Sequence, residues 1–237
     1  MINKLALLTI DTETVGLHGH VYDVGYIIHD KKGTIAVERN WLVEENFTDA
    51  KKMMGAFYAG KHFTHYARML QDGLITLKPW IEIVEQLNAD IEEYGVDVIA
   101  AYNAGFDFRV MAQTHNSLGY SGKVLNSKLE ILDIWQFACE TKLSQKSYAT
   151  IARNMGWVSP AGNIKTGAEF TYRYCSGDYS FIEDHTALSD ARIEVEILAQ
   201  CYAQKKSVPY GKINGSPWRI VNKNAGEDAD IHGSKVA

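Results

Sequence analysis

The stretch LLTIDTETVGL at residues 7–17 restricts the fold more than any other part of this 237-residue chain. It begins as an almost uninterrupted apolar run and then places Asp11 and Glu13 one residue apart. In a β-strand, residues i and i+2 point to the same face, so both carboxylates would leave a buried strand on one side. Like charges repel, and removal from water increases that cost. The stretch therefore predicts a rigid strand whose acids need a positive partner.

Composition places the chain among soluble globular proteins. Hydrophobic residues make up 46% and charged residues 22%, and both values are ordinary for such proteins. The formal net charge of -5 argues against nucleic-acid binding through bulk positive charge, although it does not exclude a local or metal-assisted site. The three cysteines are far apart, and neither a leader pattern nor a membrane-length apolar run is found. We expect a cytoplasmic protein that does not bind membranes.

Apolar periodicity predicts an α/β fold with one mixed sheet and helices on both of its faces. Short turns connect the strands expected at residues 5–11, 21–30 and 34–43, so these three should be antiparallel. Further buried strands are expected at residues 96–103 and 129–134. Helices are expected at residues 51–70, 79–94, 106–119, 147–155, 168–174 and 184–205. The polar ending GEDADIHGSKVA has no periodicity and is predicted to form a mobile tail.

Two further segments place polar side chains at the ends of expected core elements. In AYNAGFDFRVM, Asn103 ends a buried strand and Asp107 opens the next helix. In HTALSDARIEVEI, His185 and Asp190 lie five residues apart, which is a rotation of about 140° on a helix. The two side chains would not share a helix face. We therefore expect His185 at or before the first turn and Asp190 on the inner face beside the sheet.

Each segment alone also has a structural explanation. Asp11 and Glu13 could end a solvated strand, Asn103 and Asp107 could cap a helix, and Asp190 could be a surface acid. Taken together, convergent carboxylates indicate bound cations, because oxygen ligands suit Mg²⁺ or Mn²⁺. Two such ions can stabilise the attacking and leaving oxygens of a phosphoryl displacement. A nearby histidine can then act as general base on the attacking water.

The motifs Asp-Thr-Glu-Thr-Val-Gly-Leu, Asn-Ala-Gly-Phe-Asp and His-x4-Asp-Ala, in this order, resemble those of the DEDDh 3′–5′ exonucleases. This family has a ribonuclease-H-like fold and includes the proofreading subunit of bacterial DNA polymerase III, oligoribonuclease and the TREX enzymes. The resemblance also covers the order of strands from Leu5 to about Tyr202. It implies an exonuclease domain at residues 1–206, followed by a partly mobile C-terminal extension at residues 207–237.

The resemblance also implies a role for each acid, with two Mg²⁺ or Mn²⁺ ions in the site. Asp11 would bridge both ions, while Glu13 and Asp190 would hold the ion that activates water. Asp107 would act on the second ion through water. His185 would be the general base.

Substrate contacts follow from the same resemblance. The backbone N–H of Thr14 would meet the 3′-terminal hydroxyl, Leu17 would wedge against the terminal bases, and Asn103 would orient the site or contact the substrate. The complete set of implied substrate contacts is Thr12, Thr14, Leu17, Tyr102, Asn103 and Phe106. Tyr102 departs from the family pattern, because many members have histidine there. Lys165 and Arg173, in a segment that differs from the shortest members, would line a substrate groove.

The resulting prediction is a metal-dependent 3′–5′ exonuclease that releases 5′-mononucleotides by a two-metal mechanism. Its partner would be nucleic acid with a free 3′ end, single-stranded or frayed, and DNA is slightly favoured over RNA. The alternative is a nucleic-acid-binding or polymerase-accessory module of the same fold with little catalysis. All five catalytic positions are filled, which favours the enzyme.

Overall fold

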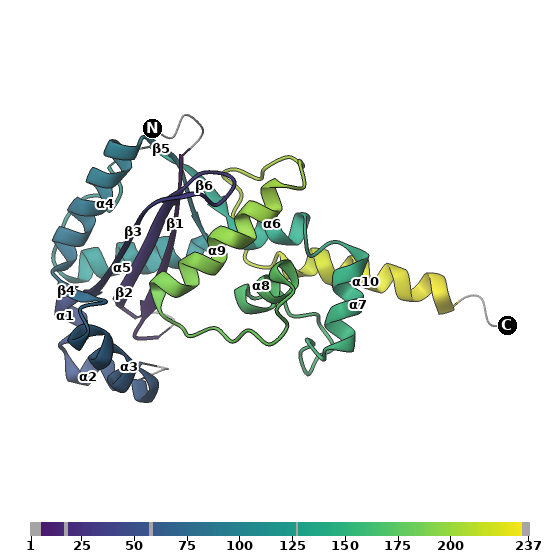
Figure 1. Cartoon of the computed structure of the whole chain (residues 1–237), viewed down its shortest axis with the longest axis horizontal. Helices are drawn as coiled ribbons and strands as arrows, with labels where there is room; N and C mark the ends of the chain where they lie inside the picture. Colours follow the sequence, from purple (N-terminus) through teal and green to yellow (C-terminus); the bar gives the residue numbers. More distant parts are fainter. Residues whose placement is uncertain (1–5, 17–18, 57–58, 127, 234–237) are drawn as a thin grey trace.

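A six-stranded mixed sheet forms the centre of the molecule, with the strands in the order β4-β3-β2-β1-β5-β6 (Figure 1). The computed structural model describes residues 6–16, 19–56, 59–126 and 128–233. The strands are β1 (Ala6–Thr14), β2 (Val21–His29), β3 (Ile35–Val43), β4 (Thr76–Lys78), β5 (Val96–Ala101) and β6 (Glu130–Asp133). β1, β2 and β3 are antiparallel neighbours, whereas β4, β5 and β6 each pair in parallel. The predicted mixed sheet is therefore confirmed, with β4 as an unpredicted edge strand.

Helices cover both faces of this sheet. They are α1 (Glu44–Phe47), α2 (Ala50–Met53), α3 (Ala59–Gln71), α4 (Trp80–Tyr94), α5 (Ala104–Ser117), α6 (Ile134–Glu140), α7 (Lys146–Asn154), α8 (Ala168–Ser176), α9 (Ala187–Tyr202) and α10 (Trp218–Gly233). Residues of α4 and α5 pack on one face, and residues of α6, α7, α9 and α10 pack on the other. Among the helices in the described part of the chain, none is long and apolar enough to cross a membrane.

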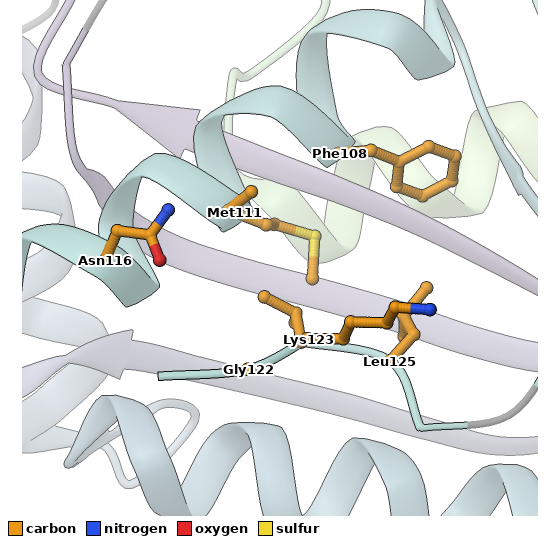
Figure 2. Close-up of a pocket in the computed structure, with 8 residues that line it drawn as sticks. Phe108, Met111, Asn116, Gly122, Lys123 and Leu125 are labelled. Atoms are coloured by element: carbon orange, nitrogen blue, oxygen red, sulfur yellow. The ribbon is translucent and has the colours of Figure 1, made fainter. Parts of the chain in front are cut away.

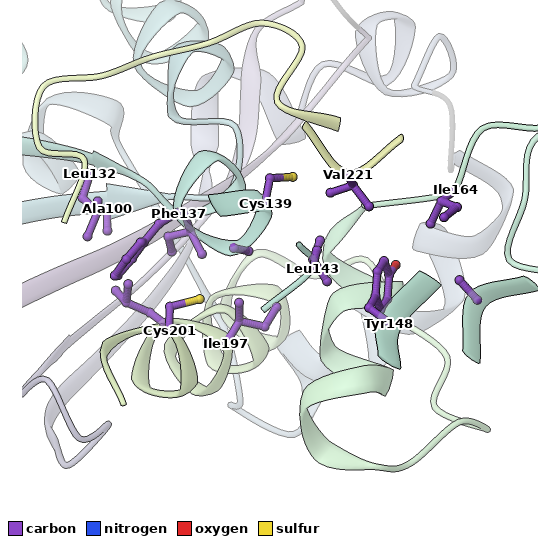
Figure 3. Close-up of a cluster of buried hydrophobic side chains, with 14 of the residues drawn as sticks. Ala100, Leu132, Phe137, Cys139, Leu143, Tyr148, Ile164, Ile197, Cys201 and Val221 are labelled. Atoms are coloured by element: carbon purple, nitrogen blue, oxygen red, sulfur yellow. The ribbon is translucent and has the colours of Figure 1, made fainter. Parts of the chain in front are cut away.

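Burial on both faces explains the unbroken apolar run of β1. Leu7 belongs to the core beneath α9, whereas Leu8 and Ile10 belong to the core beneath α4 and α5. A strand covered on both faces needs apolar residues at successive positions, not only at alternate ones. Figure 3 shows the α9 side, where Phe137 of α6 and both Ile197 and Cys201 of α9 belong to one buried cluster.

The C-terminal part of the chain differs from the prediction. Residues 218–233 form α10, which extends away from the sheet (Figure 1), so the chain is helical up to Gly233 although its sequence has no periodicity there. The mobility of this ending stays a prediction. The buried side chains of Val221 and Ala225 dock α10 into the core beneath α9. Adding residues to a helix costs much less than starting one, so the docked turns allow the helix to continue through a polar sequence.

The sheet places two parallel strand ends next to each other. β1 pairs with β5 in parallel, with Leu8 opposite Ile99 and Thr9 opposite Ala100. The carboxyl ends of both strands therefore open at the same edge, which is where open α/β sheets bind their ligands. β2 flanks β1 on its other side, with Gly25 opposite Asp11.

Candidate active site

Asp11 and Glu13 lie near the carboxyl end of β1, as the apolar run predicts. They alternate with the buried Thr12 and so share the face of Leu7, beneath α9. Oxygen Oδ2 of Asp11 is buried, and no hydrogen-bond donor from the described residues reaches it. A buried carboxylate oxygen without a donor is costly unless another partner is present.

The turn after β1 is closed by its own polar groups. The hydroxyl of Thr14 donates to the carbonyl of Gly16 at 2.9 Å, and the N–H of Val15 donates to the carbonyl of His20 at 3.0 Å. Leu17, the implied wedge, lies outside the described residues. The role of Thr14 toward a 3′ hydroxyl stays a prediction.

The connection from β5 to α5 brings Asp107 to the same edge. Asn103 adopts a left-handed backbone with φ 69° and makes no side-chain capping bond. Asp133 receives the N–H of Asn103 and also caps α6 through the N–H of Gln136 at 3.2 Å, so Asp133 has a structural role. Asp107 is buried, and it accepts the hydroxyl of Thr12 at 2.8 Å. Thr12 therefore positions an acid of the site.

The start of α9 is fixed to β2. Asp23 accepts the N–H of Ala187 at 3.0 Å and also the hydroxyl of Tyr66 from α3. A Cβ on Gly25 would lie 2.2 Å from the backbone nitrogen of Leu188, so only glycine permits this approach of helix and strand. This contact brings the first turn of α9, with Asp190, over the end of β1.

Three side chains from these elements converge. Glu13, His185 and Asp190 each offer a ligand atom, and these atoms all lie within 4.8 Å of one another. His185 precedes α9 with φ 60°, and Asp190 is buried in the first turn of the helix. This is the arrangement that the five-residue spacing predicts.

Burial and neighbouring carboxylates both disfavour the charged forms of the acids in the site. Burial, reinforced by neighbouring carboxylates, raises the pKa of Asp190 to about 10 and that of Glu13 to about 9. Burial raises the pKa of Asp107 to about 7, although the bond from Thr12 opposes this shift. The pKa of Asp11 is also raised well above its usual value, first by burial and then by Glu194 and Asp107. Divalent cations would reverse these shifts, and the all-oxygen acids with one imidazole suit Mg²⁺ or Mn²⁺.

Comparison with known proteins gives matches among solved structures. No protein-family model and no curated protein matches the sequence. E. coli Exonuclease I in complex with a dA16 oligonucleotide matches with TM-score 0.54 and 13% identity over 85% of this chain and 42% of that chain. Exonuclease I from Methylocaldum szegediense matches with TM-score 0.51 and 15% identity over 85% and 41%. Exonuclease X in complex with 5′ overhanging duplex DNA matches with TM-score 0.46 and 20% identity over 93% and 99%.

The chain has the Exonuclease I fold. The ribonuclease-H-like architecture predicted from the sequence is thereby confirmed. The chain spans less than half the length of the Exonuclease I chains that it matches. At these identities the similarity establishes the fold, and the activity is argued from the site.

Within this Exonuclease I fold, two acids beside the site were not predicted. Glu194 lies one turn after Asp190 on α9, is 2% exposed, and accepts the N–H of Tyr102 at 3.3 Å. Glu183 lies 3.6 Å from Nδ1 of His185, and burial raises the pKa of Glu183 to about 7. The helical spacing of Glu194 from Asp190 could have revealed it, because residues i and i+4 share a face.

The side chain of Tyr102 contacts the segment before α8 and the ring of Trp135 in α6. Its hydroxyl donates to the carbonyl of Thr166 at 2.5 Å, and its ring stacks beside that of Trp135 at 6.4 Å between centroids. These contacts join β5 to the segment before α8. These contacts give Tyr102 a structural role beside the site. Its implied contact with a nucleotide stays a prediction.

Arg173 braces the segment that carries His185. Its Nε donates to the carbonyl of Phe181 at 2.7 Å, and its Nη2 donates to Glu169 at 2.7 Å. The guanidinium also lies 5.2 Å from the ring centre of Phe170, and Lys165 lies 4.8 Å above the same ring. Arg173 is thus held by contacts within the protein, whereas Lys165 is exposed, and the role of both cations in a substrate groove stays a prediction.

Phe106, an implied substrate contact, lies in the first turn of α5, and an apolar pocket lies farther along this helix. The ring of Phe106 is half-buried beneath the guanidinium of Arg109, which lies 5.2 Å from the ring centre. Phe108 and Met111 of α5 and Leu125 of the following loop line a pocket of about 280 Å³ (Figure 2). No acid lines this pocket among the residues that the structure describes, so it is distinct from the acidic site.

Proposed function

We propose that the protein is a metal-dependent 3′–5′ exonuclease that hydrolyses phosphodiester bonds at nucleic-acid 3′ ends and releases 5′-mononucleotides. The observation that carries this proposal is the convergence of Glu13, His185 and Asp190 within 4.8 Å, beside Asp11 and the buried Asp107. Similarity in fold to an Exonuclease I solved with an oligonucleotide supports nucleic acid as the substrate.

The four acids would hold the metal ions. Asp11, Glu13, Asp107 and Asp190 supply oxygen donors, and the unpartnered Oδ2 of Asp11 fits a ligand shared between two ions. When bound, Mg²⁺ or Mn²⁺ would stabilise charge on the attacking and leaving oxygens of the phosphodiester. The hydroxyl of Thr12 would keep Asp107 oriented toward the site.

His185 is the candidate general base. Its side chain is 26% exposed, so its imidazole reaches the solvent from which an attacking water comes. Accepting that proton makes the imidazole cationic, and the carboxylate of Glu183 beside Nδ1 would stabilise this charge. His185 lies beside two acids of the site, because its ligand atom and those of Glu13 and Asp190 all lie within 4.8 Å of one another.

The substrate is a strand with a free 3′ end, single-stranded or frayed, with DNA slightly preferred over RNA. Thr14, Asn103 and Phe106 lie along the strand ends that surround the acids, where they can contact the terminal nucleotide. The net charge of -5 favours a short local contact over a long basic track, because binding to many phosphates requires many cations.

A direct test uses 5′-labelled DNA and RNA oligonucleotides with Mg²⁺ or Mn²⁺. We expect a ladder that shortens from the 3′ end, faster for DNA. Asp190→Asn should lower turnover at least about a thousandfold, because metal stabilisation of the transition state contributes several kcal/mol. Asp97→Asn is the matched control, since Asp97 is an exposed acid on β5, and should cleave like the wild type. Intact labelled strands with both ions would contradict the proposal and indicate a binding module.

A further inference from the structure

Glu194 is a buried acid for which the proposed chemistry has no role. It is 2% exposed, and its carboxylate accepts the N–H of Tyr102 at 3.3 Å. Its neighbours include the acids of the site, since Asp107 and Asp190 both raise its pKa after burial does. A carboxyl group here costs free energy that a leucine of similar size would not, because charge is expensive to remove from water.

The contact of Glu194 joins the two elements that carry the metal-binding acids. Tyr102 immediately precedes Asn103, where the chain turns from β5 toward α5 and Asp107. Glu194 stands one turn after Asp190 on α9. The hydrogen bond from the N–H of Tyr102 to Glu194 thus connects the turn that leads into α5, which carries Asp107, to α9, which carries Asp190.

The side chain of Tyr102 makes several contacts, and these also hold its backbone N–H in place. Its hydroxyl is bonded to Thr166 and Thr171, and its ring stacks beside Trp135. A side chain that bonds to this N–H therefore fixes α9 against a rigid part of the protein. Groups that orient metal ligands in this way commonly change metal affinity or activity by about 10–100-fold when they are replaced.

We propose that Glu194 is a positioning residue for the metal site. Its carboxyl oxygen fixes the spacing of Asp107 and Asp190 through the N–H of Tyr102. In its ionised form, which a bound cation favours, its charge strengthens the attraction of the site for divalent cations. The inference rests on the proposed function for its catalytic consequence, whereas its consequence for metal binding does not depend on turnover.

Two variants separate the two contributions. Glu194→Gln keeps an oxygen that can accept the N–H of Tyr102 but removes the charge, and we expect Mn²⁺ binding to weaken about tenfold. Glu194→Leu removes both, and we expect its kcat at saturating Mn²⁺ to lie about tenfold below that of the Gln variant with an unchanged KM for the oligonucleotide. Mn²⁺ affinity is measured by calorimetry, and kcat and KM by oligonucleotide cleavage.

Glu196→Gln is the matched control, because Glu196 is an exposed acid on the same helix and loses the same charge. Wild-type Mn²⁺ affinity in Glu194→Gln, or equal kcat values in the Gln and Leu variants, overturns the proposal. If the Leu variant does not fold, the Mn²⁺ affinity of the Gln variant still decides. Wild-type protein that binds Mn²⁺ without cleaving any strand contradicts the exonuclease proposal alone, and the calorimetry then tests Glu194 independently.

Discussion

The two ends of α9 both gather like charges, but in opposite surroundings. At its start, the partly buried Asp11 and Glu13 lie near the buried Asp190. At its end, the exposed Lys31, Lys32, Lys205 and Lys206 line a cavity of about 630 Å³ together with Tyr202. Water screens the lysines, so their repulsion costs little, whereas the buried acids repel in a low-dielectric interior. Only the buried end implies a specific counter-ion.

Gly25→Ala tests how strongly stability and turnover depend on the packing of the acidic end of α9 against β2. The added Cβ would lie 2.2 Å from the backbone of Leu188, so α9 must move away from β2. We expect about 1–3 kcal/mol of destabilisation and about a hundredfold loss of turnover, because a small misplacement of catalytic groups costs that much. Urea unfolding and oligonucleotide cleavage measure the two effects.

Gly215→Ala serves as the control for that variant, because a Cβ there meets no atom within 4 Å. It should leave stability and turnover unchanged. Wild-type turnover in Gly25→Ala would show that the contact between α9 and β2 does not place Asp190.

A second prediction uses pH to expose the repulsion at the acidic end. In EDTA, the folded protein holds protons on Asp190 and Glu13 more tightly than the unfolded chain, because their pKa values are raised to about 10 and about 9. The sign follows from proton binding: stability is highest near pH ~4, where both states are protonated, and falls as pH rises toward about 9. Urea unfolding across this range measures the slope, and Asp190→Asn should flatten it. A stability that rises over the same interval would contradict the prediction.

The smallest effect is expected at the lysine end. The double variant Lys32→Gln, Lys205→Gln removes two exposed charges and should change the free energy of unfolding by less than about 0.5 kcal/mol. Added salt should reduce even that change, because exposed charges are screened. Lys128→Gln, an exposed lysine away from the cavity, is the control. A larger change that persists at high salt would contradict the prediction, because it would mean that the lysines interact as strongly as the acids at the other end of α9.

Most of the fold could be predicted from local patterns. The buried run before Asp11 identified β1, and the helix expected at residues 79–94 is α4, which ends before Gly95 with its left-handed φ of 60°. β4 has only three residues, two of them exposed, and so carries no periodic signal. α6 follows β6 without a break, and its first residue, Ile134, continues the same apolar run. Its start is set by Asp133, whose capping role depends on the bond to Gln136.

The site was predictable where its chemistry shows in short motifs. Acids at the ends of apolar strands, and the spacing of His185 and Asp190, led to the residues that the structure brings together. Asp23 and Gly25 were not found, because their roles depend on α9, which arrives from far along the chain. A single acid inside VYDVGYII was nevertheless a signal, since an unpaired acid is rare in a buried strand.

The bond from Ala187 to Asp23 joins residues separated by 164 positions, and this has a consequence for the order of events in synthesis. The chain emerges from its N-terminus at roughly 5–20 residues per second, so the acids of β1 exist long before the helix that completes their site. Contacts of such long separation form late, after shorter loops have closed. The growing chain therefore cannot assemble the cluster until α9 has been made, and a metal ion that needs Asp190 could bind only after that point.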